Sequence, residues 1–266
     1  MFIKSPLDQN RTLMYQQKEF NYALFFTSLL ISLLATTSIQ AQNCPDNALA
    51  LLPAPLEESW AVEWWMPRHE AKLSEEGRES AKLLFLGDSI THGWENAGKP
   101  YWDQYFEEIG GHNLGFSGDR TENVLWRIEN GALDGLSPEL TIMMIGTNNT
   151  GHRQDSPECT AQGIEVILDQ LLEKLPDSQI LLLAIFPREH EPDHELRLIN
   201  SEINQRIADF DRKEGVHFLN INKIFLTNEG LLTEEIMPDM LHPNETGYEL
   251  WAEKIQPVIQ ELLNKN

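Results

Sequence analysis

From residue 82 onward, short continuous apolar runs alternate with stretches in which apolar residues recur at three- and four-residue steps. The continuous runs are candidate β-strands, because a strand covered on both faces is apolar throughout instead of alternating with polar residues. They occupy Lys82–Leu86, Leu140–Ile145, Gln179–Phe186 and Val216–Asn220, with a shorter run at Asn113–Gly115.

The stretches between these runs have the period of amphipathic helices. The clearest begins near Glu158 and continues until Pro176, which ends it. Two more are predicted over His194–Lys213 and Glu245–Leu263. Strands that alternate with helices imply right-handed crossovers, so the pattern predicts an α/β fold, a three-layer α/β/α sandwich with a central parallel sheet.

The beginning of the chain departs from this alternation. The apolar run Ala23–Ala35 follows a polar stretch with three basic residues and precedes small and polar residues that end at Ala41. It is shorter than the ~20 residues of a spanning helix and has the length of a signal-peptide core. We predict a cleaved signal peptide over residues 1–41, a secreted or periplasmic protein, and no stable membrane insertion after cleavage. An uncleaved N-terminal anchor is the alternative.

Residues 42–80 are interpreted as a leader that packs on the core through an apolar face of Trp60, Trp64 and Trp65. Residues 81–266 then form the main domain, because the strand–helix alternation continues to the end without a repeat or a low-complexity linker. Arg68 and His69 stand out in the leader, but the sequence assigns them no role.

The chain is strongly acidic. Its 266 residues contain 20 Lys and Arg against 42 Asp and Glu, which gives a formal net charge of −22. Nucleic acids and anionic membranes attract basic patches, so this balance disfavours both as partners. The charge balance predicts no oligomeric state, and it does not identify a substrate.

Two cysteines, Cys44 and Cys159, are present. In an exported protein they can form a disulfide, but Cys44 lies near the start of the exported chain, and the pairing depends on geometry. Both states therefore stay open. There is no C-x-x-C pair, so the pattern indicates neither a zinc ribbon nor a thioredoxin-like site, and no metal or cofactor is expected.

The first strand ends on Gly87-Asp88-Ser89, and this turn has two interpretations. Ser89 is either the N-cap of the next helix or a nucleophile at the carboxyl edge of the sheet, where open α/β folds bind ligands. A nucleophilic serine needs a base and a group that orients it. Asp239 and His242, three residues apart in the loop before the last helix, supply both residue types; a solvated helix-entry turn is the alternative.

Two further strand ends carry candidate oxyanion donors. Gly118 brings a backbone N–H close to a ligand, and Asn148 places an amide just past the third strand. Simple turns explain each residue equally well when it is taken alone. Ser117 is a rival nucleophile, but Asp119 stands where a G-x-S-x-G elbow needs its final glycine.

Together these blocks resemble the SGNH, or GDSL-type, serine ester hydrolases. The blocks Gly87-Asp88-Ser89, Gly118, Gly146-Thr147-Asn148-Asn149 and Asp239-Met240-Leu241-His242 occur in the family's order across roughly residues 82–260. The stretch Asn113–Arg127 and the Asn-Asn pair, where many members have Asn-Asp, look most like the catalytic subunits of platelet-activating-factor acetylhydrolase.

The resemblance implies a flavodoxin-like SGNH hydrolase domain over residues 81–266 and no cofactor. It makes Ser89 the nucleophile, His242 the base and Asp239 its orienting acid, with Ser89, Gly118 and Asn148 as the oxyanion hole. The implied function is an exported esterase for short, above all acetyl, esters of carbohydrate or of acetyl- or lyso-phospholipid. A catalytically silent binding domain and a transacylase or thioesterase that uses the same triad are the alternatives.

Five residues that follow the catalytic blocks are candidates for lining a substrate pocket, although exposed loop positions explain them equally well. They are His92, Trp94, Arg120, His152 and Arg153.

Overall fold

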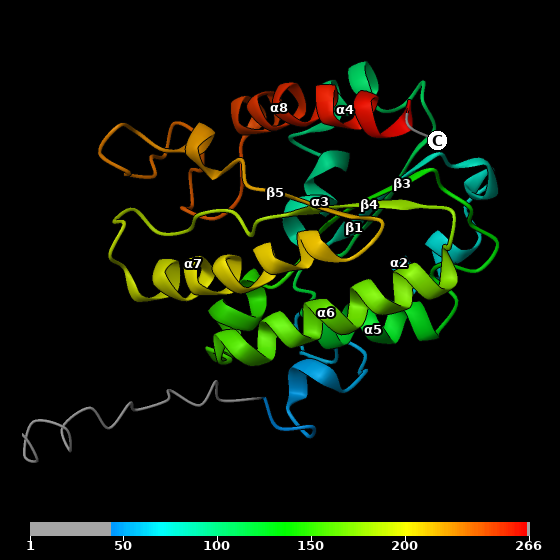
Figure 1. The fold of residues 1–266 in the computed structure, drawn as a ribbon, viewed down its shortest axis with the longest axis horizontal. Helices are drawn as coiled ribbons and strands as arrows, with labels where there is room; N and C mark the ends of the chain where they lie inside the picture. Colours follow the sequence, from blue (N-terminus) through cyan, green and yellow to red (C-terminus); the bar gives the residue numbers. More distant parts are fainter. Residues whose placement is uncertain (1–43, 265–266) are drawn as a thin grey trace, which may run out of the picture. The chain divides into compact units, whose positions relative to one another are not determined.

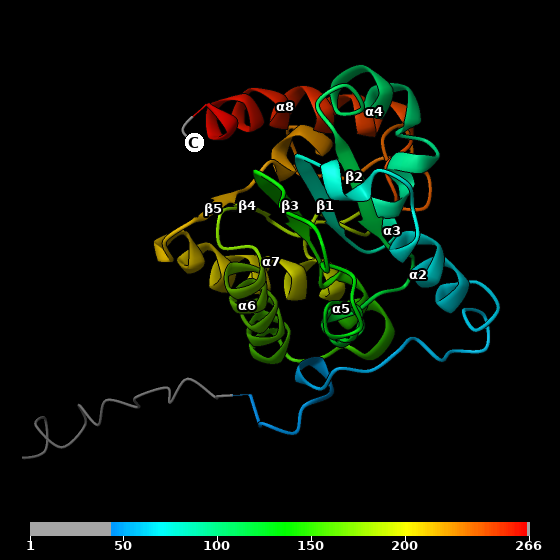
Figure 2. The same cartoon turned by 90° about the vertical axis from the view of Figure 1, so that its right-hand side faces the viewer.

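A five-stranded parallel sheet forms the centre of the computed structural model, which describes residues 44–264 (Figures 1 and 2). The strand order is β2-β1-β3-β4-β5, and every neighbouring pair is parallel. The predicted signal peptide, residues 1–41, lies outside the described residues and stays a prediction. The strands are β1 (Leu83–Gly87), β2 (Gly111–Gly115), β3 (Leu140–Met144), β4 (Gln179–Leu183) and β5 (Val216–Leu219).

Helices cover both faces of this sheet, which confirms the predicted three-layer α/β/α sandwich. The helices α5, α6 and α7 pack on one face, and α4 and α8 pack on the other (Figure 2). The α-helices are α2 (Trp65–Leu73), α3 (Ser89–His92), α4 (Lys99–Tyr105), α5 (Thr121–Glu129), α6 (Pro157–Lys174), α7 (Glu195–Ile207) and α8 (Glu245–Leu263). Short 3₁₀ segments are η1 (Leu49–Leu51), η2 (Arg78–Ser80), η3 (Gly93–Glu95), η5 (Ala208–Arg212) and η6 (Asn222–Phe225), and η4 (Asn149–Arg153) is a π-helical turn.

The two covered faces explain why the strands are apolar throughout. In β1, Leu84 and Leu86 belong to the cluster under α5 and α6, whereas Leu83 and Phe85 belong to the cluster under α4 and α8. All five residues of β1 are buried. A strand with one solvated face would need polar residues at alternate positions, so the continuous apolar run is a direct signature of the sandwich.

The prediction for the fourth strand is three residues too long. The apolar run extends to Phe186, but β4 ends at Leu183. Beyond this point the side chains of Asn204 and Asn222 replace the neighbouring strand as partners of the backbone. Asn204 accepts from the Ile185 N–H at 2.7 Å and donates to its carbonyl at 2.8 Å, and Asn222 donates to the same carbonyl at 2.9 Å.

The long helices follow their sequence signals closely. α6 begins after Ser156, whose hydroxyl accepts from the Cys159 N–H at 3.2 Å, and it ends before Pro176. The predicted helix over His194–Lys213 divides into α7 and the tighter η5, and α8 has the predicted bounds. Within residues 44–264, no helix has both the length and the apolar character needed to cross a membrane.

Residues 44–64 run along α5 and α6 before they enter α2. A disulfide joins Cys44 to Cys159 at the start of α6, so the structure has the paired state of the two that the sequence left open. Further along, the Ala50 carbonyl accepts from the Thr121 hydroxyl at 2.8 Å, and the Ala54 carbonyl accepts from the Asn123 amide at 2.9 Å. These bonds fasten the segment beside the loop that follows β2.

Candidate active site

The turn after β1 places Ser89 as the first residue of α3. The N-cap is Asp88, whose Oδ1 accepts from the Ile90 N–H at 3.0 Å, so the interpretation of Ser89 as the cap is wrong. Gly87 allows the close approach of this turn to β3, because a Cβ there would overlap Thr91 Oγ1 and the Met144 carbonyl. The serine hydroxyl therefore stands at the carboxyl edge of the sheet with no capping role of its own.

Ser89, His242 and Asp239 come together across 150 residues of chain. Ser89 Oγ lies 2.8 Å from His242 Nε2, and His242 Nδ1 lies 2.6 Å from Asp239 Oδ2. A carboxylate accepts hydrogen bonds, so Nδ1 carries the proton and the lone pair of Nε2 faces the serine hydroxyl. This is the arrangement in which a histidine removes a proton from a serine.

The loop before α8 fixes the orientation of this pair from within. Asp239 Oδ1 accepts from the backbone N–H groups of Leu241, at 3.1 Å, and His242, at 2.7 Å. Partial burial acts in the opposite direction, but the hydrogen bonds from the His242 side chain and from these two N–H groups lower the pKa of Asp239 below its usual value. Asp239 therefore stays ionised behind the imidazole.

The candidate oxyanion donors lie on the two neighbouring loops. Gly118 has a φ of +82°, a left-handed conformation that favours glycine, and a Cβ at this position would overlap the Trp60 ring. Asn148, which is almost fully buried, donates from Nδ2 to the Asp119 carbonyl at 2.9 Å. This bond holds the amide of Asn148 against the residue that follows Gly118.

A buried ion pair braces the loop that carries Gly118. Asp119 and Arg127 are both fully buried, and Asp119 Oδ2 lies 2.8 Å from a guanidinium nitrogen of Arg127. The Trp65 indole N–H donates to Asp119 Oδ1 at 2.6 Å. Asn149 joins the two loops, because its Oδ1 accepts from the Thr121 N–H at 3.1 Å. The second asparagine of the Asn-Asn pair thus holds together the two loops that carry Gly118 and Asn148.

His92 and His152, two predicted pocket residues, lie beside aromatic side chains at the same edge. The His92 ring centre is 6.3 Å from that of Trp64, and the His152 ring centre is 6.2 Å from that of Trp60. Burial, together with nearby arginine charges, lowers the pKa of both histidines, in His92 to about 4. Both rings are therefore neutral near pH 7.

Arg120 and Arg153, also predicted to line the pocket, belong to an ion-pair cluster. Arg120 pairs with Glu58 and Glu122, and Arg153 pairs with Glu122 and, at 2.5 Å, with Asp155. Arg120 is only 7% exposed. The cluster links the N-terminal segment to the loop after β2, and its carboxylates balance the two arginine charges.

The prediction that Trp94 lines the pocket is wrong. Its side chain is fully buried on the sheet face that α4 and α8 cover. The short η3 turn directs it into the core, where its ring contacts Phe85, Phe106, Tyr248 and Trp251. Closeness to Ser89 in sequence therefore does not place this tryptophan in the site.

Ser117, the rival nucleophile, also has a histidine partner. His92 Nδ1 lies 3.0 Å from Ser117 Oγ, and His92 Nε2 lies 3.7 Å from Glu95. The Glu95 carboxylate also forms ion pairs with two other side chains. It accepts two hydrogen bonds from Arg68, at 2.9 and 2.8 Å, and lies 3.1 Å from Lys72 Nζ. The sequence left Arg68 without a role, and the structure gives it this one.

Several residues that shape the site carry no local sequence signal. In the predicted apolar face of the leader, Trp65 is buried and Trp64 packs against the same small cluster, whereas Trp60 is half exposed and lies against Gly118. Arg188 donates to the Thr147 carbonyl at 2.9 Å, beside Asn148. The predicted convergence of strand ends indicates that Thr147, after β3, and Arg188, after β4, come near each other, but it does not place Trp60 or Trp64, which precede the first strand.

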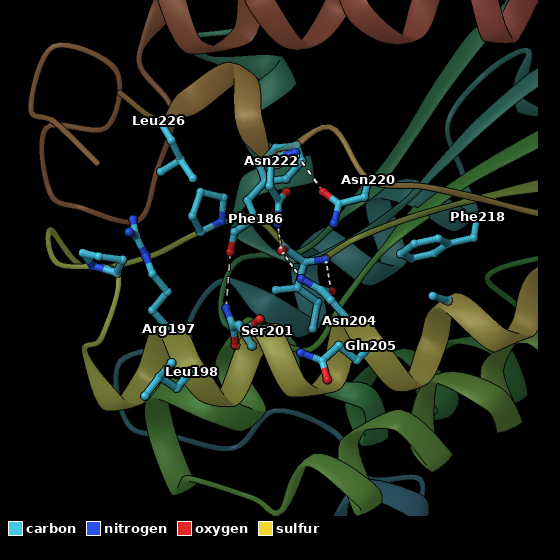
Figure 3. A pocket seen from close by; sticks show the side chains of 15 residues that line it. Phe186, Arg197, Leu198, Ser201, Asn204, Gln205, Phe218, Asn220, Asn222 and Leu226 are labelled. Atoms are coloured by element: carbon cyan, nitrogen blue, oxygen red, sulfur yellow. Dashed lines mark hydrogen bonds between the residues drawn. The ribbon is translucent and has the colours of Figure 1, made fainter. Parts of the chain in front are cut away.

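A cavity of about 420 Å³ lies between α7, the segment after β4 and η6 (Figure 3). None of its lining residues belongs to the Ser89, His242 and Asp239 group. Its polar lining includes Asn204 and Asn222, which bond the Ile185 backbone, and Arg197, which donates to the Gly230 carbonyl at 2.7 Å. Within residues 44–264, no group of three or more His, Cys, Asp or Glu side chains is arranged to hold a metal ion.

Sequence comparison finds relatives over most of the chain. The model of the GDSL-like lipase/acylhydrolase family matches residues 85–250. Platelet-activating factor acetylhydrolase IB subunit alpha1 from Bos taurus is 28% identical over 222 residues, which cover 83% of this chain and 93% of the relative. Subunit alpha2 from Homo sapiens is 28% identical over 221 residues, with 83% and 94% covered.

Solved structures share the fold at lower identity. A GDSL-like lipase from Bacteroides thetaiotaomicron matches with a TM-score of 0.62 at 19% identity, covering 73% of this chain and 97% of that one. An acetylxylan esterase from Geobacillus stearothermophilus matches with a TM-score of 0.55 at 18% identity, covering 68% and 94%. Both support the same parallel-sheet architecture.

Proposed function

The chain belongs to the GDSL-like lipase/acylhydrolase family and is a carboxylic ester hydrolase, and from that premise we propose an exported serine esterase that cleaves short-acyl, above all acetyl, esters. One observation carries the proposal. Ser89 Oγ lies 2.8 Å from His242 Nε2, and the opposite ring nitrogen lies 2.6 Å from an ionised Asp239.

Acylation begins when Ser89 Oγ attacks the ester carbonyl carbon and its proton passes to His242 Nε2. The carbonyl oxygen becomes an oxyanion, and the imidazolium that forms is stabilised by Asp239. The tetrahedral intermediate collapses when the C–O bond to the alcohol breaks. The leaving alkoxide takes the proton from Nε2, which leaves an acyl-Ser89 ester.

Deacylation repeats these steps with water. His242 Nε2 takes a proton from water as the oxygen attacks the acyl carbon, and the proton then returns to Ser89 Oγ when the carboxylic acid is released. The charge that appears in both tetrahedral states is bound by the N–H groups of Ser89 and Gly118 and by the Asn148 amide. These donors are held in place before the reaction, so they favour the transition state over the ground state.

Two substrate classes fit this reaction. The curated relatives are platelet-activating factor acetylhydrolase subunits, which supports an acetyl- or lyso-phospholipid. One structural neighbour is an acetylxylan esterase, which supports an O-acetylated carbohydrate. An acetyl-phospholipid and an O-acetylated carbohydrate share the short acyl group and differ in the alcohol portion, whereas a lyso-phospholipid carries a long acyl chain.

The proposal that the protein is exported rests on two features. The apolar run Ala23–Ala35 has the length of a signal-peptide core. The disulfide between Cys44 and Cys159 supports an oxidising compartment, because disulfides are rare in the cytosol. Mass spectrometry of the exported product is expected to find an N-terminus at Gln42, and a chain retained in the cytosol with Met1 intact would contradict export.

The experiment follows acetate release from acetylated oligosaccharides and from an acetyl-phosphocholine lipid, beside p-nitrophenyl esters of increasing acyl length. Ser89→Ala is the blank, and Ser117→Ala is the matched control. We expect hydrolysis that decreases with acyl length and disappears only in the blank. If no substrate shows Ser89-dependent turnover, the chain is a silent binding domain. Preferential transfer to an added alcohol over water would make it a transacylase.

A further inference from the structure

Four aromatic side chains form a row at the edge of the candidate active site. In order they are His92, Trp64, Trp60 and His152, and we call them the aromatic row. Successive ring centres are 6.3, 6.3 and 6.2 Å apart. The planes of the first three rings differ from their neighbours by only 37° and 32°. The His152 ring is turned by 76° from the Trp60 ring, so only His92, Trp64 and Trp60 have similar ring planes.

The aromatic row lies directly against the catalytic loops. The six-membered ring of Trp60 occupies the space beside Gly118 that a Cβ would fill. At one end His92 lies 3.0 Å from Ser117 Oγ, and at the other His152 belongs to the η4 turn that follows Asn148. A molecule that lies on the row is thus next to the carbonyl oxygen during the reaction.

The exposure of Trp60 is unusual in this protein. Its side chain is 51% exposed, whereas Trp65, Trp94 and Trp251 are buried in the core. A half-exposed indole gives up part of the hydrophobic free energy that its burial would supply, unless a ligand covers the ring. Because burial and nearby cations keep His92 and His152 uncharged near neutral pH, all four rings of the row are uncharged on an acidic chain.

The aromatic row is also held in place. The Trp64 indole N–H donates to the Trp60 carbonyl at 3.2 Å, and the Ala61 N–H donates to the Glu58 carbonyl at 2.7 Å. Glu58 pairs with the buried Arg120. A surface that is ordered before binding costs a ligand less entropy than one that orders on contact.

We propose that the aromatic row binds the sugar rings of an O-acetylated glycan and makes this carbohydrate the substrate class. The inference rests on the proposed function, because it concerns the alcohol portion of the same ester. A sugar ring has faces of C–H bonds and a rim of hydroxyl groups, so it stacks on an indole while its rim stays in water. A row of several rings matches a chain of sugars.

The competing ligand is the choline group of a phospholipid. A quaternary ammonium is bound by aromatic faces that surround it. Here the planes of His92, Trp64 and Trp60 differ by only 37° and 32° from one ring to the next, and only His152 is nearly perpendicular to its neighbour, at 76°. The geometry therefore favours an extended neutral ligand over a compact cation.

The test compares Trp60→Ala with the native enzyme on an acetylated xylo-oligosaccharide and on p-nitrophenyl acetate, which has no sugar. In Trp60→Ala, kcat/KM for the oligosaccharide divided by kcat/KM for p-nitrophenyl acetate is expected to decrease about tenfold, mainly because KM for the oligosaccharide rises. Trp64→Ala is expected to change the ratio in the same direction, and Trp64 is one ring farther from Gly118. Trp60→Phe is expected to restore most of it.

Val62→Ala is the matched control, because Val62 is equally exposed, at 52%, in the same segment but is not in the row. It is expected to leave the ratio unchanged. An unchanged ratio in both tryptophan variants would overturn the proposal, as would a decrease only for an acetyl-phosphocholine ester. The proposed function fails by a different result, namely p-nitrophenyl acetate hydrolysis that persists in Ser89→Ala.

Discussion

Two serine–histidine contacts lie at the same edge of the sheet, one after β1 and one after β2. Ser89 contacts His242 Nε2 at 2.8 Å, and Ser117 contacts His92 Nδ1 at 3.0 Å. By this distance alone the two pairs are nearly equivalent. They differ in what lies behind the histidine.

Behind His242 stands Asp239 at 2.6 Å, ionised and directed at the ring. Behind His92 stands Glu95 at 3.7 Å, whose charge is shared with Arg68 and Lys72. Burial and the Arg68 charge lower the pKa of His92 to about 4, so it accepts a proton poorly at neutral pH. A serine–histidine hydrogen bond is therefore not sufficient for catalysis, and the charge behind the histidine distinguishes the two pairs.

The largest expected effect separates the two serines. Ser89→Ala is expected to lower kcat for p-nitrophenyl acetate at least about 10⁴-fold, because it removes the nucleophile. Ser117→Ala is expected to stay within about threefold of the native enzyme. Steady-state kinetics on both variants checks this.

The loss of kcat in His242→Ala is expected to match that in Ser89→Ala. The double variant is expected to lose little more, since the effects of substitutions within one catalytic unit are not additive. A mild effect of His242→Ala would remove it from the mechanism. Loss of activity in Ser117→Ala would exchange the roles of the two pairs.

The next comparison concerns the two carboxylates. Asp239→Asn is expected to lower kcat by about 10²–10⁴-fold, because the neutral amide neither fixes the tautomer of His242 nor stabilises its imidazolium. Glu95→Gln, which keeps the size of the side chain, is expected to lower it less than about fivefold. Equal losses from the two substitutions would show that charge behind the histidine is not the distinguishing property.

Asn148→Ala tests the oxyanion hole that we propose for the Ser89–His242 pair. Asn148→Ala is expected to lower kcat about 10²–10³-fold with little change in KM, since the amide bonds the charge only in the transition state. Thr147→Ser, at the neighbouring position, is the control. A change confined to KM would exclude Asn148 from the oxyanion hole.

The smallest expected effect is on stability and concerns the cap before Ser89. Burial raises the pKa of Asp88 to about 7, against the Ile90 hydrogen bond, which acts in the opposite direction. Between the ordinary carboxyl pKa and 7, the folded chain therefore holds a proton that the unfolded chain has lost. This lowers the free energy of unfolding as pH rises, by roughly 1 kcal/mol per pH unit.

Asp88→Asn keeps an oxygen that accepts from Ile90 but does not titrate. In urea titrations between pH 5 and 7, the native protein is expected to lose stability relative to this variant as pH rises. Parallel pH profiles for the two proteins would mean that Asp88 has the same pKa in the folded and unfolded chains.

The sequence predicts the layers and the converging strand ends because both depend on local patterns. The alternating burial of Leu83 and Leu84 in two clusters is encoded in one continuous apolar run, and Ser89 and Asn148 follow such runs directly. The end of β4 was not predictable, because it depends on a side chain of α7, Asn204, that bonds the Ile185 backbone.

The environment of a side chain is harder to predict than its place along the chain. Trp94 and Trp60 are both tryptophans within 30 residues of Ser89 in sequence, yet one is in the core and the other borders Gly118. The contact between Trp60 and Gly118 joins positions 58 residues apart, so no helical or strand period in the sequence indicates it. Only the assembled fold shows which of the two lies against Gly118.

The position of the aromatic row along the chain has a practical consequence for engineering. Trp60 and Trp64 are encoded in a stretch fastened to the domain by Arg120 and by the disulfide at Cys44, whereas the proton-transfer groups are encoded after residue 87. Two of the four rings of the aromatic row are therefore encoded before Ser89, Asp239 and His242, whereas His92 and His152 lie among the blocks that follow residue 87. A mutant library confined to codons 56–64 would explore new alcohol portions while every catalytic side chain stays native.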